Sequence, residues 1–136
     1  MTTTTVKPTA KEVVRIQIAS ILHQIDCRIE NMTEKMNSDY LHFFELQAED
    51  MFKEQKRRAF FTELASAVED TDSYVDLYSW LGGIANHKVD VLVRGCLTRN
   101  STSEMVNIAH LLNLEVEKEL IRDLESLAQL AGYYGK

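Results

Sequence analysis

The sequence has few of the features on which small secreted domains or membrane proteins depend. Only two of its 136 residues are cysteines, Cys27 and Cys96, which is too few for a disulfide framework. No charged start followed by an apolar block resembles a signal peptide. No uninterrupted apolar run approaches the roughly 20 residues that cross a bilayer. We therefore expect a cytoplasmic protein with reduced thiols and no membrane partner.

Positive charge is also scarce. The chain has 15 Lys and Arg residues against 21 Asp and Glu residues, which gives a formal net charge of -6 at pH 7. Nucleic acids and anionic membrane surfaces attract proteins through a positive field, so this composition disfavours both as partners. Hydrophobic residues make up 45% of the chain, enough to form the core of a single soluble domain.

The sequence motifs of several enzyme classes are missing. The chain has no phosphate-binding loop of the GxxxxGK[ST] type, no GxSxG elbow, no CxxC pair and no HExxH motif. We interpret both cysteines as structural, because cysteine is among the most buried residue types. We interpret the acidic clusters as solvated helix faces. The sequence therefore predicts a protein that is not an enzyme and needs no cofactor.

Apolar residues recur at helical intervals along most of the chain. Thr9 and Glu12 have the spacing of a capping box just after Pro8, the only proline. An apolar stripe with intervals of three and four follows: Val14, Ile18, Ile21, Ile25, Ile29, Met32 and Met36. With the similar stripes further on, this pattern predicts an all-α fold, a compact bundle of five or six helices. We expect a disordered N-terminal tail over 1–8, one domain over 9–132 and a C-terminal tail over 133–136.

The segment from Ser38 to Glu69 allows two interpretations. Ser38 is expected to cap a helix whose apolar stripe includes Leu41 and Phe44, whereas the stripe beyond the basic run includes Phe61 and points in another direction. Either one continuous helix buries different sides in its two halves, or the helix breaks near 53–58. No glycine or proline marks a break, so both interpretations stand.

The next predicted helix begins near a second capping-box spacing, Ser73 with Asp76. It crosses Gly82-Gly83, where we expect a kink, a close-packing point or a boundary. The segment Val89–Val93 resembles a strand locally, but no second strand signal exists to pair with it. We therefore interpret it as helix.

The C-terminal part predicts two further helices. Ser101 and Glu104 have capping-box spacing and open a short helix, which Asn113 is expected to end or redirect. A last helix then follows and stops at Gly132. This pair superficially resembles a helix-turn-helix unit. The second helix would repel DNA through its acids, so a DNA-binding regulator is a minor alternative; these acids are Glu115, Glu117, Glu119, Asp123 and Glu125.

A metal-binding bundle of the ferritin-like kind is the runner-up hypothesis. It would use His42, Glu45 and His87. The Glu-x-x-His motif of those bundles is absent. Helical geometry also points all four histidines away from the apolar stripes, so we predict no metal site.

The stretch EQKRRAFF, Glu54 to Phe61, combines cations with aromatic rings. Arg and aromatic residues dominate the binding energy of protein interfaces when they lose their water. We predict a partner-binding surface that consists of Phe43, Arg57, Arg58, Phe60, Phe61 and Trp80. The leading hypothesis is a small non-enzymatic helical adaptor or regulatory protein that acts through protein-protein contacts, as a homodimer.

Overall fold

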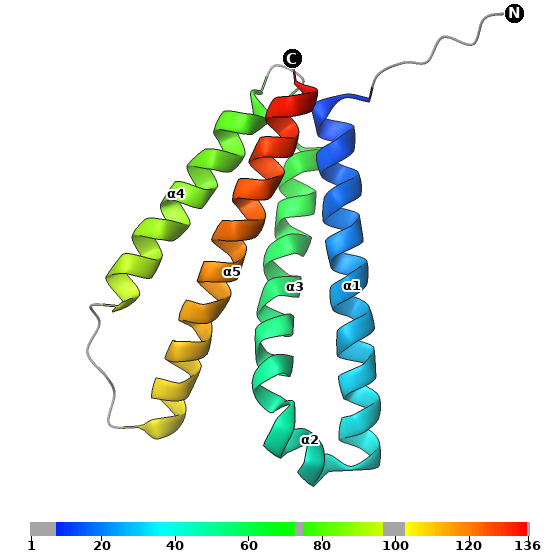
Figure 1. Cartoon of the computed structure of the whole chain (residues 1–136), viewed down its shortest axis with the longest axis vertical. Helices are drawn as coiled ribbons and strands as arrows, with labels where there is room; N and C mark the ends of the chain where they lie inside the picture. The colour runs from blue at the N-terminus through cyan, green and yellow to red at the C-terminus, as the bar shows by residue number, and fades with distance from the viewer. Residues whose placement is uncertain (1–7, 73–74, 97–102, 136) are drawn as a thin grey trace, which may run out of the picture.

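The computed structural model describes residues 8–72, 75–96 and 103–135, and every element in these ranges is an α-helix (Figure 1). The predicted all-α bundle is therefore confirmed, with five helices in the described residues. They are α1 (Ala10–Ser38), α2 (Tyr40–Leu46), α3 (Ala48–Glu69), α4 (Leu77–Cys96) and α5 (Glu104–Tyr134). Residues 1–7 of the expected N-terminal tail lie outside the described ranges. Within those ranges, no helix combines the length and apolar character that a bilayer span needs.

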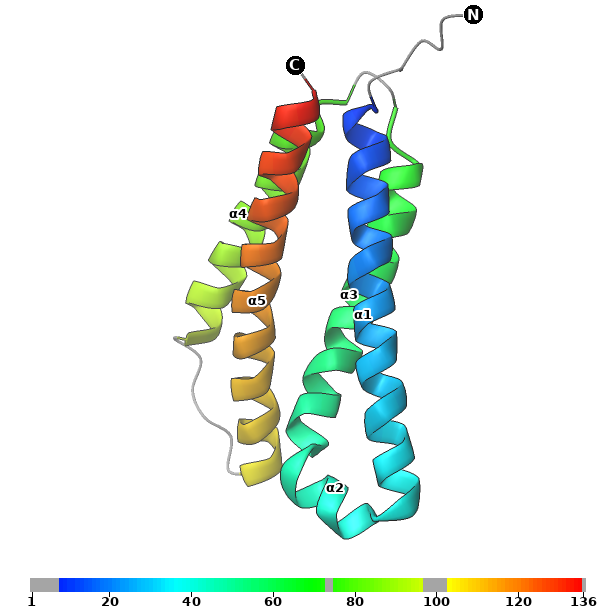
Figure 2. The ribbon, with the colours of Figure 1, turned by 45° about the vertical axis from the view of Figure 1, so that its right-hand side comes forward.

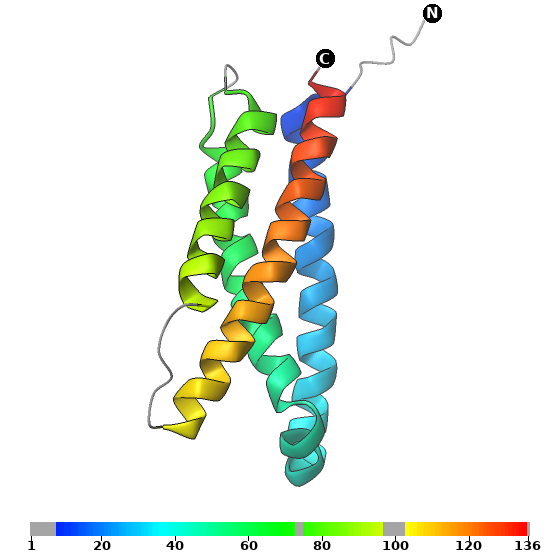
Figure 3. The same cartoon turned by 60° about the vertical axis from the view of Figure 1, so that its left-hand side comes forward.

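The long helices lie side by side, and α2 closes the end of the bundle opposite the two termini (Figures 1 and 2). α1 packs on α3 and α5, whereas α4 packs chiefly against α5 (Figure 3). The core contains buried apolar side chains from α1, α3, α4 and α5. Its largest fully buried members are Phe61, Ile18, Ile25, Leu81, Leu120, Leu124, Leu127, Val14 and Val68.

The start of α1 follows the sequence prediction closely. The Thr9 side chain accepts a hydrogen bond from the Glu12 N–H at 3.2 Å, which confirms Thr9 as the N-cap. From the predicted stripe, α1 buries Val14, Ile18, Ile25 and Met32. The helical period thus identified the face that α1 turns to the core.

The segment from 38 to 69 forms two helices, and they meet at Gln47. Asp39, not Ser38, caps α2, because its carboxylate accepts a hydrogen bond from the His42 N–H at 3.2 Å. Gln47 has φ -127° and ψ -7°, which interrupts the helix before α3 begins. The break suggested for 53–58 is therefore wrong: the basic run lies inside α3. The stripe predicted for α2 is also wrong, since Phe43 is buried and Phe44 is 57% exposed.

α4 runs without interruption from Leu77 to Cys96. Its first turn is capped by Asp76, which accepts hydrogen bonds from the Tyr78 N–H at 3.1 Å and the Ser79 hydroxyl at 2.9 Å. Ser73 lies outside the described residues. A Cβ at Gly82 or Gly83 would meet no atom within 4 Å, so the glycine pair is neither a boundary nor a close-packing point. The interpretation of Val89–Val93 as helix is confirmed.

α5 is one helix of 31 residues, so Asn113 neither ends nor redirects it. Ser103 caps it by accepting a hydrogen bond from the Val106 N–H at 3.4 Å, whereas Ser101 lies outside the described residues. The helix also passes Gly132 and ends at Tyr134. The two-helix unit on which the DNA-binding alternative rested does not form.

Candidate functional site

Arg57, at the centre of the basic run, lies against α5 rather than on an open surface. Its Nη2 is 3.2 Å from Asp123 Oδ2, its Nη1 is 3.2 Å from Glu54 Oε1, and its Nε is 3.7 Å from Glu119 Oε2. Only 13% of its side chain is exposed. Arg57 therefore joins α3 to α5 and is not available as a surface cation.

Lys53 makes a second link between α3 and α5, one helical turn away. Its Nζ donates a hydrogen bond to Glu115 Oε2 at 3.2 Å and lies 3.8 Å from Asp50 Oδ1. The hydrogen bond to Glu115 raises the pKa of Lys53 above its ordinary value. Partial burial lowers the pKa by less, and the neighbouring carboxylates raise it further.

Four acids of α5, Glu115, Glu117, Glu119 and Asp123, are thus paired across helices, so they are not a simple solvated face. Glu117 accepts a hydrogen bond from Lys88 Nζ of α4 at 3.1 Å, and only 20% of its side chain is exposed. Together with the pairs of Lys53 and Arg57, this contact fixes α5 between α3 and α4. The acids that argued against DNA binding have a structural role here.

Arg58, next to Arg57, has a different environment. Its Nε lies 2.6 Å from Asp26 Oδ1 of α1, and about half of each side chain is exposed, 51% and 52%. This is a solvated ion pair on the seam between α1 and α3. Among the predicted partner-binding residues, Arg58 is the one with a largely exposed side chain.

The predicted aromatic contact residues mostly pack within the bundle. Phe61 is 0% exposed and Phe43 is 5% exposed. Phe60 and Trp80 are half-buried against the core, and Lys88 Nζ lies 4.7 Å from the centre of the Phe60 ring. Phe43 in α2 and Trp80 in the first turns of α4 belong to opposite ends of the bundle (Figure 1). The structure does not bring these rings together as one surface.

The histidines do not form a metal centre within the described residues, where no group of three or more His, Cys, Asp or Glu side chains has a suitable arrangement. His42, Glu45 and His87 are therefore not assembled into a site. His23, His42 and His87 are exposed, as helical geometry predicts. His110 is half-buried, contrary to that prediction, and its Nε2 lies 3.0 Å from the Gly95 carbonyl oxygen.

Both cysteines are exposed, so the expectation of buried, structural thiols is wrong. Cys27 Sγ lies 3.7 Å from His23 Nε2, a contact that the spacing of four residues on one helix allows. A thiol beside an imidazole is an arrangement of cysteine nucleophiles. This pair lies on an exposed helix face, without the walls that enclose a substrate.

A hollow of about 390 Å³ opens between α1, α3 and α5. Arg28 of α1 faces it, and its Nη1 lies 3.5 Å from Glu54 Oε1. Lys53 and Asp50 line it as well. Ligand pockets are mostly apolar with a few polar groups, whereas this hollow is lined by charges of both signs. We interpret it as part of the ion-pair network that joins the helices.

The main concentration of exposed apolar side chains lies at the end of the bundle away from the termini (Figures 1 and 3). We call this surface the apolar end; its residues are Tyr40, Leu41, Phe44 and Leu46 of α2, and Met105, Val106, Ile108 and Leu111 of α5. The exposed Val89, Val91 and Val93 lie on α4, which ends well short of α2 and of the start of α5 (Figures 1 and 3). The other large apolar side chains that are exposed among the described residues are Ile16, Val75, Tyr78 and Tyr133, of which Tyr78 and Tyr133 line one shallow hollow beside Gly132. The period of apolar residues did not predict the apolar end, although the apolar composition of α2 signals it.

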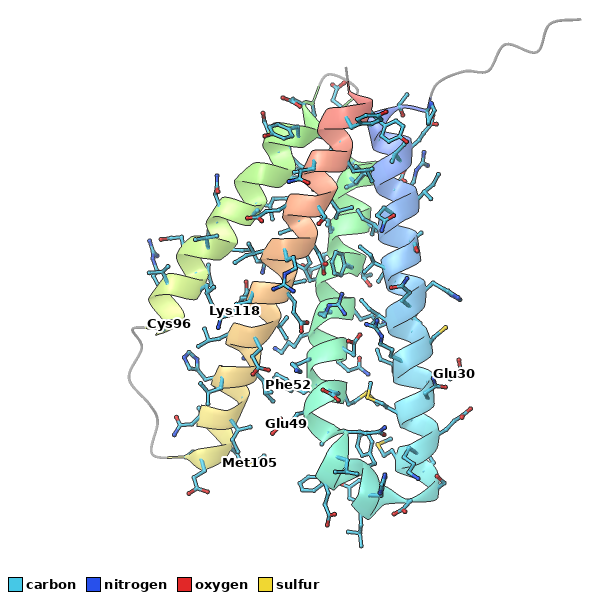
Figure 4. All side chains as sticks on the ribbon, in the orientation of Figure 1. Glu30, Glu49, Phe52, Cys96, Met105 and Lys118 are labelled. Atoms are coloured by element: carbon cyan, nitrogen blue, oxygen red, sulfur yellow. The ribbon has the colours of Figure 1, made fainter. Side chains whose placement is uncertain are left out.

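The aromatic residues of the apolar end are held in place by their neighbours. Tyr40 and Phe44 stack with ring centres 6.2 Å apart, and Tyr40 also contacts the buried Phe43 at 6.4 Å. On α5, Met105 lies at the lower end of the helix and is 70% exposed (Figure 4). Aromatic rings that are fixed in this way lose little conformational entropy when they bind.

Comparisons with known proteins add no functional information. No family model, no curated protein and no solved structure matches the chain. A helical bundle by itself hosts many unrelated functions. The functional argument therefore depends on the residues of this chain.

Proposed function

We propose that this protein is a small helical adaptor or regulatory protein that acts without catalysis, by binding another protein through its apolar end. The observation that carries the proposal is the concentration of exposed apolar side chains on α2 and the start of α5. Single exposed apolar residues are normal on a monomer, whereas a cluster of them marks an interaction surface.

The size of the exposed surface supports this proposal. Tyr40 is 58% exposed and Phe44 is 57% exposed. At 150 to 250 Å² for a whole aromatic side chain, these two rings alone expose on the order of 200 Å². Leu41 and Leu46 of α2, 73% and 65% exposed, and Met105 of α5, 70% exposed, add to this apolar surface.

Self-association through the same end is the second candidate, because the apolar side chains of one copy would cover those of another. We also propose a cytoplasmic location. Cys27 and Cys96 are both exposed and unbridged, and exposed thiols persist in a reducing compartment.

The test replaces two apolar side chains of this end, Phe44→Ser with Met105→Ser. Ile16→Ser is the matched control, because Ile16 is 68% exposed but lies on α1, away from the apolar end. Proteins that associate with each variant in the native cells are fixed by a short-range crosslinker and identified by mass spectrometry. Sedimentation of the purified variants measures self-association.

We expect the double variant to lose at least one crosslinked partner that the control retains, with unchanged helical circular dichroism. Loss of a wild-type dimer in the double variant alone would support the second candidate. Identical partners and identical mass for the wild type, the double variant and the control would remove the assignment of the apolar end as a binding surface.

A further inference from the structure

We infer that the segment bound at the apolar end is a basic amphipathic helix: a helix with one apolar face flanked by Lys and Arg. This inference rests on the proposed function and adds the chemistry of the partner. It is carried by two observations, the charge around the exposed apolar residues and the helical backbone of the surface that presents them.

The charge at the apolar end is negative. The acidic residues of the last two turns of α1, of Asp39 and α2, and of the first two turns of α3 and α5 are Glu34, Asp39, Glu45, Glu49, Asp50, Glu54 and Glu104. The Lys and Arg residues of the same parts are Lys35 and Lys53.

Lys53 is engaged within the bundle, because its Nζ lies 3.2 Å from Glu115 Oε2 and 3.8 Å from Asp50 Oδ1. By contrast, Glu45, Glu49 and Glu104 form no ion pair within the part of the chain that the structure describes. These three carboxylates leave a negative field that a partner can neutralise.

The acids stand directly beside the exposed apolar residues. Glu45 lies between Phe44 and Leu46 in α2, and Glu104 precedes Met105 in α5. Figure 4 shows Glu49 near the start of α3, on the side of the helix toward α5. An occupant of this surface therefore needs positive charges as well as apolar side chains.

This charge distribution distinguishes between the occupants. A second copy of the chain would bring the same acids against each other, and like charges that meet in an interface oppose association. An anionic lipid surface is repelled for the same reason. A basic segment is attracted, and its positive charges also accelerate the encounter.

The backbone of the surface favours a helix as the bound form. A peptide that binds as a strand needs an exposed sheet edge for its backbone hydrogen bonds, and the described residues contain only helices. A helix satisfies its own backbone and presents apolar side chains at intervals of three and four. It can therefore cover the apolar end without unpaired backbone groups.

The experiment measures binding of fluorescent model peptides to the full chain. The first peptide is an amphipathic helix of leucine and lysine, the second carries glutamate in place of lysine, and the third is a scrambled leucine–lysine sequence. Protein variants are Phe44→Ser with Met105→Ser, and the triple change Glu45→Gln, Glu49→Gln and Glu104→Gln. Ile16→Ser is again the control. Urea unfolding of each variant separates a loss of binding from a loss of stability, because Glu49 and Glu104 lie in first helical turns, where an acid also stabilises the helix.

We expect the leucine–lysine helix to bind the wild type and the control equally, and to bind the glutamine variant about tenfold more weakly at low salt. The serine variant should lose at least about tenfold in affinity at any salt concentration. Equal affinity for the acidic helix or the scrambled peptide would overturn the inference. So would binding of the leucine–lysine helix that is unchanged in both the serine variant and the glutamine variant.

The outcomes separate the two proposals. If partners crosslink at the apolar end but the basic peptide shows no preference, protein binding stands and the basic partner is refuted. If the apolar substitutions change neither crosslinking nor peptide affinity, both proposals fail. A wild-type dimer that the serine substitutions abolish would refute the basic helix as occupant and favour a second copy.

Discussion

Arg57 and Arg58 are neighbours in the sequence, yet the structure predicts very different effects for their removal. Arg57→Ala takes away a guanidinium that is 13% exposed and leaves three carboxylates without their shared cation. Arg58→Ala removes a half-exposed side chain with one ion-pair partner, Asp26, which is itself half-exposed. The pair forms a matched comparison within one helix.

The exposure of the partners sets the magnitude. Losing one member of a fully buried ion pair costs about 3 to 5 kcal/mol, whereas an exposed pair contributes about 0 to 1 kcal/mol. Glu54 is 13% exposed, Asp123 29% and Glu119 45%, so the network lies between these limits. We expect Arg57→Ala to lower the free energy of unfolding by about 2 to 3 kcal/mol and Arg58→Ala by about 0.5 kcal/mol.

Urea unfolding at pH 7, followed by far-ultraviolet circular dichroism, measures both effects. With an m-value of about 2 kcal/mol per M, Arg57→Ala should lower the midpoint by about 1 M, and Arg58→Ala by a few tenths at most. Equal losses for the two variants would refute the reasoning, because burial would then not decide the contribution. A loss below about 1 kcal/mol for Arg57→Ala would show that the network contributes no more than a surface pair.

Three further predictions concern packing, helix propensity and pH. Phe61→Ala should lower the free energy of unfolding in urea by about 3 to 5 kcal/mol, because Phe61 is 0% exposed. Phe44 is 57% exposed, so Phe44→Ala should change this free energy by less than about 0.5 kcal/mol. Gly83→Ala should raise the free energy of unfolding by about 0.5 to 1 kcal/mol, and with it the melting temperature, because the added Cβ meets no atom within 4 Å. A lower melting temperature for this variant would contradict the prediction. The pKa of Lys53 is raised in the folded state, so its contribution is complete below pH 10.5 and is lost as the pH rises through the folded pKa. Glu115→Gln should therefore lower the free energy of unfolding at pH 8, and should make the decline of this free energy above pH 10.5 less steep than in the wild type. If plots of unfolding free energy against pH are parallel for the wild type and Glu115→Gln, the Lys53–Glu115 pair does not have this role.

The period of apolar residues was sufficient to predict the helices and most of the core. It failed at Asn113, where a residue with weak breaking tendency was taken for a helix end. The apolar residues Leu112, Val116 and Leu120 keep one helical phase through this point, and all three are buried. Continuity of phase is therefore a stronger signal than a single asparagine, because burial of the stripe stabilises the helix across it.

The break at Gln47 had no comparable signal. It lies between a capping aspartate, Asp39, and a helix whose N-cap makes no side-chain hydrogen bond. Phe43 is buried there while its neighbours on both sides are exposed. The position of the break thus depends on how one ring fits the end of the bundle, which local propensity does not determine.

The basic run was misjudged because its partners are distant in the sequence. Glu54 is three residues from Arg57, but Asp123 lies 66 residues away. Lys53 and Glu115 are separated by 62 residues. These pairs between α3 and α5 can be predicted only when the packing of the two helices is known. The sequence alone therefore indicates a binding surface where the structure has a link between two helices.

The same geometry explains why apolar residues remain exposed at one end. A helical period shows which face of a helix is apolar, but not whether another helix reaches far enough to cover it. α4 packs chiefly on α5, and the first turns of α5 leave Met105 and Leu111 exposed. Uncovered apolar surface promotes association between copies, and acids beside it oppose that association by like-charge repulsion. If the proposed basic partner is correct, Glu45, Glu49 and Glu104 limit self-association and attract that partner through the same field, so both effects should weaken together as the ionic strength rises.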